Sequence, residues 1–193
     1  MYVKNITKRF GDKLVLDGFS ADFPDGKASF VVGQSGCGKS TLLNIIMGLL
    51  PADSGELDPR FSDKISAVFQ EDRLCEKLSA AANVRLVCPA DDEEIIFSLS
   101  EVGLAREDAL RPVSELSGGM KRRAAIVRAV MADSRTVIMD EPFKGLDPSS
   151  KSRTIEYVLK NLRGRTLIAV THDISEADAM NGKIFEIHGK TID

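Results

Sequence analysis

One segment, Gly33 to Ser40, constrains what this chain can fold into more than any other part of it. It reads Gly-Gln-Ser-Gly-Cys-Gly-Lys-Ser and fits the pattern G-x-x-x-x-G-K-[ST]. The apolar residues Ala28 to Val32 before it predict a strand, and Lys39 to Leu50 predict a helix. In that context glycines let backbone N–H groups face a phosphate, and the helix N-terminus adds partial positive charge. Lys39 can reach the β- and γ-phosphates of a nucleotide, and Ser40 can offer its hydroxyl to Mg²⁺. The alternative is a glycine turn followed by a surface lysine.

Length and composition limit the class of protein. The chain has 193 residues, enough for one domain or for one domain with an inserted subdomain. Its formal net charge of −3 argues against sequence-independent nucleic-acid binding, so no nucleic-acid partner is expected. No apolar run approaches the roughly 18 residues of a membrane span, and the N-terminus lacks a signal-peptide core. The three cysteines form neither a disulfide framework nor a zinc pattern. We therefore expect a cytoplasmic protein with reduced thiols.

The rhythm of the chain predicts an α/β fold with a parallel sheet covered on both faces, because short apolar strands alternate with helices. Turn signals separate strands expected at Tyr2 to Thr7 and at Lys13 to Phe19. Further elements are expected beyond residue 134: strands at Thr136 to Asp140, Thr166 to Thr171 and Lys183 to His188, and helices from Asp147-Pro148 to about Leu162 and from Ser175 to Asn181.

The stretch from Glu71 to about Asp133 predicts two amphipathic helices instead. In the first, acidic residues at 91–94 suit the N-terminal turn and Gly103 ends the helix. The second is expected from Gly118 to Ala132. Their apolar faces are expected to consist of Ile95, Ile96, Leu99 and Val102, and of Ala124, Val127 and Val130 or Met131.

A second candidate phosphate-transfer segment is Val137 to Glu141. Its apolar residues predict a strand that delivers Asp140 and Glu141 to the carboxyl edge of the sheet. Asp140 would hold Mg²⁺, and Glu141 would lie where an attacking water could sit. The alternative is that these two acids only mark the end of a strand. The presence of the phosphate-binding loop in the same chain makes that alternative a minor one.

A third segment, Leu116 to Met120, reads Leu-Ser-Gly-Gly-Met and precedes Lys121-Arg122-Arg123. Ser-Gly-Gly at the start of a helix offers a hydroxyl, free N–H groups and a positive dipole, and so predicts another anion-binding site. Taken alone, the segment would indicate an ordinary serine N-cap. A chain with two phosphate-binding helix ends needs an explanation.

Together these segments resemble the nucleotide-binding domain of an ABC (ATP-binding cassette) ATPase, over nearly the whole chain and in the right order. Gly33 to Thr41 resembles the Walker A motif, Val137 to Glu141 Walker B, and Leu116 to Met120 the signature Leu-Ser-Gly-Gly-Gln. Single positions complete the resemblance: Gln70 of the Q-loop, Asp147 of the D-loop, His172 of the H-loop, and Phe10 where the family stacks an aromatic ring on adenine.

The resemblance implies a dimer in which two cassettes sandwich two ATP molecules between the Walker A of one subunit and the signature of the other. Glu141 would polarise water, His172 would contact the γ-phosphate, and Lys39 and Gln70 would complete the catalytic set. Mg²⁺ would be held by Ser40, Gln70 and Asp140. The ATP-binding residues would be Phe10, Gly33, Gln34, Ser35, Gly36, Cys37, Gly38, Lys39, Ser40, Thr41, Ser117, Gly118, Gly119, Met120 and Asp147.

The resemblance also implies a single domain over 1–193: a P-loop core of 1–70 and 134–193 with an N-terminal antiparallel β edge, and an inserted helical subdomain of about 71–133 that carries the signature. The sequence departs from the family in four places. Met120 replaces the usual signature Gln, Phe10 lacks a tyrosine hydroxyl, Lys144 is an unusual charge beside the D-loop, and the segment from Ser40 to Gln70 is short. We expect trimmed edge strands, weakened nucleoside contact at Met120, and no C-terminal regulatory domain.

Within the family, Phe69 to Leu74, Ala82-Asn83-Val84 and Glu141-Pro142-Phe143 are most similar to importers of the nitrate, sulfonate and taurine group. The expected function is an ATP-hydrolysing subunit on the inner face of the cell membrane. Its expected partners are transmembrane permease subunits, a second ATPase subunit and, indirectly, an extracytoplasmic solute-binding protein. The alternatives are an ABC ATPase outside transport and a nucleotide-dependent switch with weak hydrolysis.

Overall fold

The computed structural model describes residues 1–187, and the chain folds into two compact units. The first unit comprises residues 1–65, 134–141 and, within the described part of the chain, 164–187. The second comprises residues 66–133 and 142–163. None of the helices within residues 1–187 is both long and apolar enough to cross a membrane.

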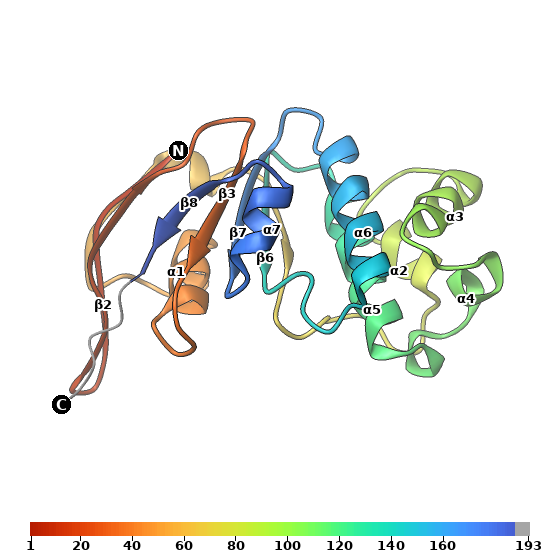
Figure 1. Ribbon diagram of the computed structural model, residues 1–193, viewed down its shortest axis with the longest axis horizontal. Coiled ribbons are helices and arrows are strands. Elements are labelled where there is room, and N and C mark those ends of the chain that lie inside the picture. The colour runs from red at the N-terminus through yellow and green to blue at the C-terminus, as the bar shows by residue number, and fades with distance from the viewer. Residues whose placement is uncertain (188–193) are drawn as a thin grey trace. The chain divides into compact units, whose positions relative to one another are not determined.

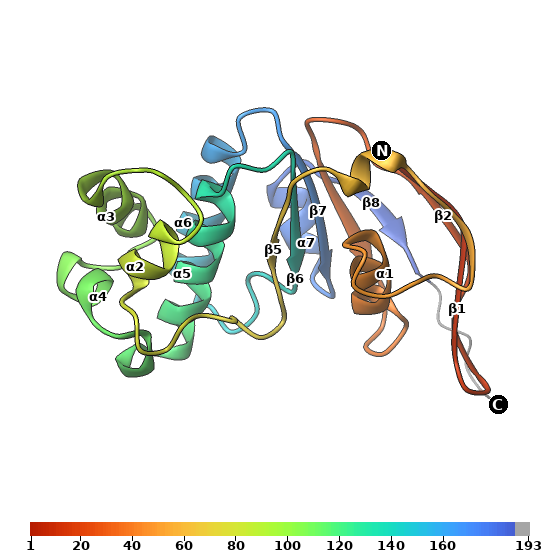
Figure 2. The same ribbon diagram turned by 180° about the vertical axis from the view of Figure 1, so that it is seen from behind.

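A five-stranded sheet has the strand order β5-β6-β7-β3-β8. β3 and β7, which lie at its middle, are buried along their whole length, as expected of strands covered on both faces. Helices α1 and α7 lie on opposite faces of this sheet (Figures 1 and 2). The elements are β3 (Ala28–Val32), α1 (Lys39–Ile46), β5 (Ile65–Val68), β6 (Thr136–Asp140), β7 (Thr166–Thr171), α7 (Ile174–Ala179) and β8 (Lys183–Glu186). These findings confirm the predicted α/β fold.

The register of the parallel strands places three strand ends at one edge of the sheet. Val32, the last residue of β3, pairs with Thr171, the last residue of β7. Asp140, the last residue of β6, pairs with Val170 of the same central strand. The segments that follow β3, β6 and β7 therefore leave the sheet side by side.

An antiparallel sheet with strand order β2-β1-β4 completes the first unit, as the sequence predicted for its N-terminal edge. Its strands are β1 (Tyr2–Phe10), β2 (Lys13–Asp22) and the short β4 (Ser54–Leu57), and the 3₁₀ helix η1 (Pro59–Ser62) follows. Phe23 is fully buried and meets the rings of Phe61 and Phe185 edge-on, at centroid distances of 6.4 and 5.1 Å. The four-residue β4 agrees with the expectation of trimmed edge strands.

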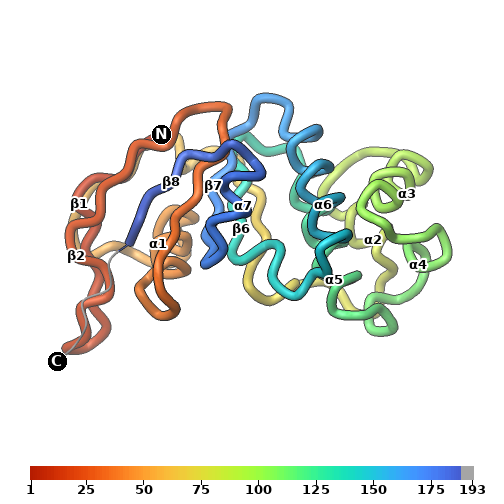
Figure 3. Tube along the Cα trace, viewed as in Figure 1, coloured from red at the N-terminus to blue at the C-terminus, as the bar shows by residue number. Residues whose placement is uncertain are grey.

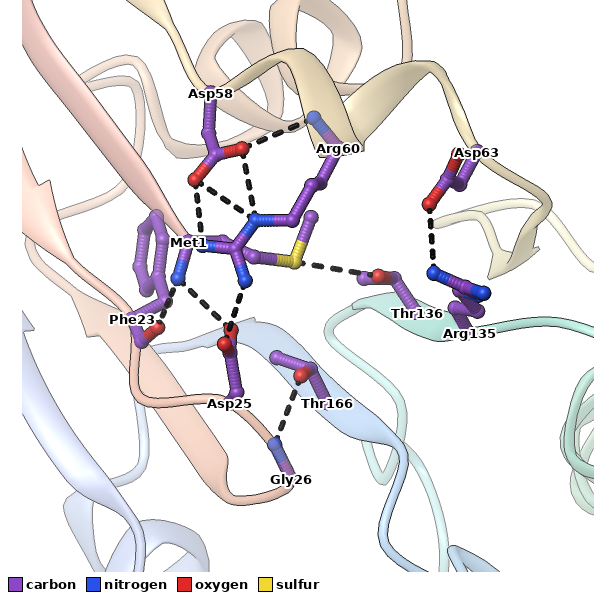
Figure 4. A network of polar contacts seen from close by, with 10 residues as sticks. All are labelled: Met1, Phe23, Asp25, Gly26, Asp58, Arg60, Asp63, Arg135, Thr136 and Thr166. Atoms are coloured by element: carbon purple, nitrogen blue, oxygen red, sulfur yellow. Dashed lines mark hydrogen bonds and ion pairs between the residues drawn. The ribbon is translucent and has the colours of Figure 1, made fainter.

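A polar network lies beside this core (Figure 4). The carboxylate of Asp58 accepts hydrogen bonds from the backbone N–H and the guanidinium of Arg60, at 2.7–3.2 Å. Arg60 Nη1 also lies 2.5 Å from Asp25, and the amino group of Met1 donates to the carbonyl of Phe23. The Arg60 guanidinium lowers the pKa of Asp58 to about 2.

The second unit is helical, and its helices pack along one another (Figure 3). The prediction of two helices in this part of the chain was incomplete. Two short helices, α2 and α4, and the 3₁₀ helix η2 also form, and they have too few turns for a clear apolar period. The elements are α2 (Ala80–Arg85), α3 (Asp92–Glu101), α4 (Arg106–Leu110), η2 (Val113–Glu115), α5 (Gly118–Met131) and α6 (Pro148–Asn161). The predicted apolar faces of α3 and α5 are buried, with Val130 rather than Met131 among the buried residues.

Several element ends differ from the predictions. α1 stops at Ile46 rather than Leu50, because Gly48 adopts a left-handed backbone with φ of +69°. β1 extends to Phe10 because the hairpin continues to its turn, and β2 extends to Asp22 because its far end pairs with Tyr2 of β1. The expected end of the last strand, His188, lies outside the described residues.

Candidate functional site

The loop from Gly33 to Ser40 requires glycine at the positions where its backbone is tightly enclosed. A Cβ on Gly33 would lie 2.6 Å from the carbonyl oxygen of Ile187 and 2.7 Å from Cys37 Sγ. Gly38, with φ of +104°, is the N-cap of α1, and a Cβ there would lie 2.9 Å from the carbonyl oxygen of Val15. Only glycine therefore fits at these two positions of the loop, the second of which leads directly into α1.

Lys39 is the first residue of α1 and is almost completely buried. Its ammonium donates to the carbonyl oxygens of Gly33 and Gln34, at 2.7 and 2.9 Å. A buried charge needs such partners. These two hydrogen bonds tie the beginning of the loop to the first residue of α1. Within the described residues, no side chain caps the N-terminus of α1. Its positive end is thus directed at the loop, where a phosphate would bind.

Glu141 follows the end of β6 in a strained conformation. Its φ is +48°, in the left-handed region that costs a residue with a side chain about 1–2 kcal/mol. Its N–H donates to the carbonyl of Val170 at 2.9 Å, which fixes this turn against β7. Strain of this kind persists where the surrounding structure imposes it, commonly at functional sites.

His172 follows the end of β7, and its Nδ1 lies 2.7 Å from Glu141 Oε2. The histidine side chain is 59% exposed, whereas that of Glu141 is 13% exposed. The neighbouring Thr171 donates its hydroxyl to the buried Glu176 at 2.8 Å and accepts from the N–H of Asp173 at 3.0 Å. Thr171 and Glu176 thus hold the turn that presents His172. Neither residue carries a signal in the sequence, since nothing in the chain spacing shows this contact.

Phe10 lies at the tip of the β1–β2 hairpin, and its ring is half exposed. The same hairpin reaches the phosphate-binding loop, because Val15 and Leu16 of β2 enclose Gly38. The first unit therefore contains all of these residues, and its parallel strands finish at one edge beside the loop from Gly33, Asp140, Glu141 and His172.

The remaining predicted site residues belong to the second unit. Ser117 is the N-cap of α5, and its exposed hydroxyl accepts from the N–H of Met120 at 3.3 Å. Gly118 is exposed as well. Asp147 is the N-cap of α6 and accepts from the N–H of Ser150 at 3.0 Å. Hydrogen bonds from the Ser150 hydroxyl and, less strongly, from its N–H lower the pKa of Asp147. Gln70 and Lys144 are exposed.

The donor chemistry of the first unit suits Mg²⁺ held together with a nucleotide. Within residues 1–187, no three His, Cys, Asp or Glu side chains gather closely enough to hold a metal by themselves. Mg²⁺ typically takes only one or two protein ligands beside phosphate oxygens and waters. Ser40 at the start of α1 and Asp140 at the end of β6 offer the hydroxyl and carboxylate oxygens that such a site needs.

Comparison with known proteins points to one family. Residues 16–144 match the family model described as ABC transporter. The aliphatic sulfonates import ATP-binding protein SsuB 1 of Mesorhizobium japonicum is 36% identical over 197 residues, covering 95% of this chain and 74% of that protein. The protein of the same name from Agrobacterium fabrum is 37% identical over 193 residues, covering 95% and 69%.

Solved structures agree. A dimeric post-hydrolysis state of the ATP-binding cassette MJ0796, bound to ADP and phosphate, superimposes with a TM-score of 0.83. Its sequence is 29% identical, and the superposition covers 98% of this chain and 95% of the MJ0796 chain. A second dimeric structure of MJ0796, described as a bacterial ABC transporter cassette, gives a TM-score of 0.81 at 30% identity, covering 97% and 94%. The motifs, the fold and these relatives lead to one conclusion: the chain belongs to the ABC transporter family of ATP-binding cassettes.

Proposed function

We propose that this protein is the ATP-hydrolysing subunit of a membrane importer, in which closure and opening of a cassette dimer drive solute transport. The relatives described above are named as import ATP-binding proteins for aliphatic sulfonates. We place the chain's importer in the same solute group. Neither alternative, an ABC ATPase outside transport or a weakly hydrolysing switch, has a comparable observation in its favour.

ATP would bind at the end of the first unit's parallel sheet. The adenine would stack on Phe10, since stacking needs only the ring. The phosphates would lie on the backbone N–H groups of Gly33 to Thr41 at the start of α1, and Lys39 would turn from its carbonyl partners to the β- and γ-phosphates. Ser40, Asp140 and Gln70 would hold Mg²⁺, which neutralises phosphate charge when bound.

Hydrolysis would be the attack of water on the γ-phosphate, which gives ADP and phosphate. Glu141 would orient and polarise this water, and His172 would contact the γ-phosphate. The observation that carries this proposal is the 2.7 Å approach of His172 Nδ1 to Glu141 Oε2 at the strand ends beside the phosphate-binding loop. A carboxylate can only accept a hydrogen bond, so this contact assigns a proton to Nδ1 of His172.

The second phosphate-binding helix end would serve a partner subunit. Ser117, Gly118, Gly119 and Met120 would face the γ-phosphate on the second cassette, with Asp147 at the same seam. The exposure of Ser117 and Gly118 supports this assignment, and both solved relatives described above are dimers. A homodimer is the simplest arrangement.

The protein would act on the inner face of the cell membrane, bound to permease subunits that receive solute from an extracytoplasmic binding protein. In this scheme the catalytic core is 1–70 with 134–193, and the helical subdomain of about 71–133 carries the signature.

Two measurements test the proposal. Purified protein should release phosphate from ATP, and Lys39→Ala should abolish that release while remaining folded by circular dichroism. Expressed with its permease, the chain should co-purify with it from detergent-solubilised membranes. Recovery of the chain only in the soluble fraction, although the permease is present, would refute the importer assignment. Phosphate release that persists in Lys39→Ala would refute the assigned ATP site.

A further inference from the structure

The segment that carries Gln70 has little structure of its own. Residues 69–73, which follow β5, form neither helix nor strand. Arg73 has a left-handed backbone with φ of +46°, and its guanidinium lies over the ring of Phe69, 3.7 Å from the ring centroid. The segment therefore curls back on itself. Backbone carbonyls in such a segment must find hydrogen-bond donors elsewhere.

Two arginines of α5 supply those donors. Arg122 donates to the carbonyl oxygens of Phe69 and Gln70, at 2.6 and 2.9 Å. Arg128 donates to those of Asp72 and Arg73, at 3.2 and 2.8 Å. In Figure 2 the chain can be followed from β5 past α5 to α2. Four carbonyls of the five-residue segment are thus held by one helix.

Of the two arginines, Arg122 is the one that fastens Gln70 itself. Its side chain is only 8% exposed, and its Nη1 also lies 3.2 Å from Asp72 Oδ1. Arginine presents its donors in a rigid planar fork, so two carbonyls and a carboxylate can be engaged in one fixed geometry. A lysine at this position could not reproduce that geometry.

Arg122 also lies on the helix that begins immediately after Ser117, about one turn from its start. An α-helix is stiff over such a distance. Gln70 and the N-terminus of α5 are therefore two ends of one rigid connection within the second unit.

We propose that Arg122 is a positioning residue for Gln70, fixing the Gln70 backbone to the helix end that carries Ser117. This inference rests on the proposed roles of Gln70 at Mg²⁺ and of Ser117 at the partner's γ-phosphate. A shift of the α5 N-terminus on meeting the partner's nucleotide then moves Gln70 with it. The metal-contacting side chain and the signature serine would thus respond together.

Amide hydrogen exchange tests the positioning step without reference to activity. Arg122→Gln should speed exchange in peptides that cover residues 69–74, whereas Arg122→Lys should do so less, because it keeps a charged donor. Arg123→Gln is the matched control: Arg123 lies on the same helix but donates to the carbonyls of Val102, Gly103 and Gly119. It should leave exchange at 69–74 unchanged. Unchanged exchange in both Arg122 variants would overturn the proposal.

ATP binding tests the consequence. The affinity for ATP is measured by calorimetry with Mg²⁺ and with EDTA, and the ratio of the two gives the gain from the metal. Arg122→Gln should reduce this gain about tenfold, as is typical when support for a metal-contacting group is lost. Arg123→Gln should not change it. A loss of stability alone would not move this ratio.

A double-variant comparison separates the inference from the proposed function beneath it. If Arg122 acts through Gln70, adding Arg122→Gln to Gln70→Ala should reduce the metal gain no further. Fully additive losses would contradict the inference and leave the role of Gln70 intact. If Gln70→Ala alone leaves the metal gain unchanged, the role of Gln70 at Mg²⁺ fails, and hydrogen exchange still decides whether Arg122 fixes the segment.

Discussion

His172 Nδ1 and Glu141 Oε2 lie 2.7 Å apart, each on a turn that follows a buried parallel strand. The contact joins two residues that are 31 positions apart in sequence. It leads to the first prediction. Glu141→Gln keeps the side-chain volume and the same backbone cost at φ of +48°, so the protein should fold and bind ATP. Phosphate release should fall by about 10²–10⁴-fold, the range for a positioned acid–base group.

This first prediction is checked by steady-state phosphate release and by gel filtration with ATP, where the variant should accumulate as a dimer. His172→Ala is the companion variant. It should also lose most turnover, since it removes the partner of the Glu141 carboxylate. Near-native turnover in Glu141→Gln would show that Glu141 does not polarise the water.

A second prediction concerns Ser117 and sites shared between subunits. Ser117→Arg places bulk and charge at the exposed start of α5, while the chain's own phosphate-binding loop is untouched. ATP binding by the monomer should survive, but dimerisation and hydrolysis should fail. Ser117→Ala is the control: it loses the same helix cap, worth about 1 kcal/mol, without adding bulk, and it should still dimerise.

Mixing two inactive variants sharpens this test. A dimer of one Ser117→Arg chain and one Lys39→Ala chain has one site with both defects and one with neither, if sites are built across the interface. Some turnover should therefore return on mixing. Sites within single chains could not be restored in this way. Full ATPase activity in Ser117→Arg alone would contradict the assignment of this helix end.

A third prediction follows from the buried carboxylate of Asp58. Its pKa is about 2 in the folded protein, chiefly because of the hydrogen bonds from the Arg60 side chain, against about 3.9 in an unfolded chain. A lowered folded pKa adds stability that is fully present above about pH 4 and is lost as the pH falls toward 2. Asp58→Asn should cost about 1–2 kcal/mol at pH 7 and flatten the acid decline in stability.

Urea unfolding of the native protein and of Asp58→Asn at pH 7, 4 and 3 checks this third prediction. The difference in unfolding free energy should shrink as the pH falls through that window. A difference that stays constant from pH 7 to 3 would mean that the Asp58 carboxylate is not responsible.

A fourth prediction concerns Asn83, a fully buried side chain in α2. Its Oδ1 accepts from the N–H of Cys75 at 2.7 Å, and its Nδ2 donates to the carbonyls of Cys75 and Ser79, at 3.1 and 2.9 Å. Asn83→Ala leaves these groups unpaired and should lower the free energy of unfolding by about 2–3 kcal/mol. Asn83→Asp should cost at least as much, because an oxygen then faces both carbonyls.

Thermal unfolding checks this fourth prediction, with Ser79→Ala as the reference for a smaller loss of stability. Ser79 only caps α2, by accepting from the N–H of Ala82 at 3.1 Å, so its loss should cost about 1 kcal/mol. If Asn83→Asp were as stable as the native protein, the two donated hydrogen bonds would have no structural role.

Local chemistry is what the sequence determined by itself. The boundaries of β3, β6 and β7 were predicted to the residue, because short apolar runs bounded by turn residues have few alternatives. The caps at Asp147 and Ser117 and the family itself were also accessible, since they depend on residues that are neighbours in the chain. The short helices α2 and α4 were missed, because five or six residues carry too little period to distinguish them from a loop.

Contacts between distant residues were decided only by the tertiary structure. The motifs named Glu141 and His172, but only the register of β6 and β7 brought their side chains within 2.7 Å. In the sequence, nothing in the Lys121-Arg122-Arg123 run indicates that its two arginines have different partners. In the fold, Arg122 holds the Gln70 segment, whereas Arg123 holds the end of α3. Consecutive residues on a helix point about 100° apart, so neighbours of one chemistry reach different partners that the linear sequence does not reveal.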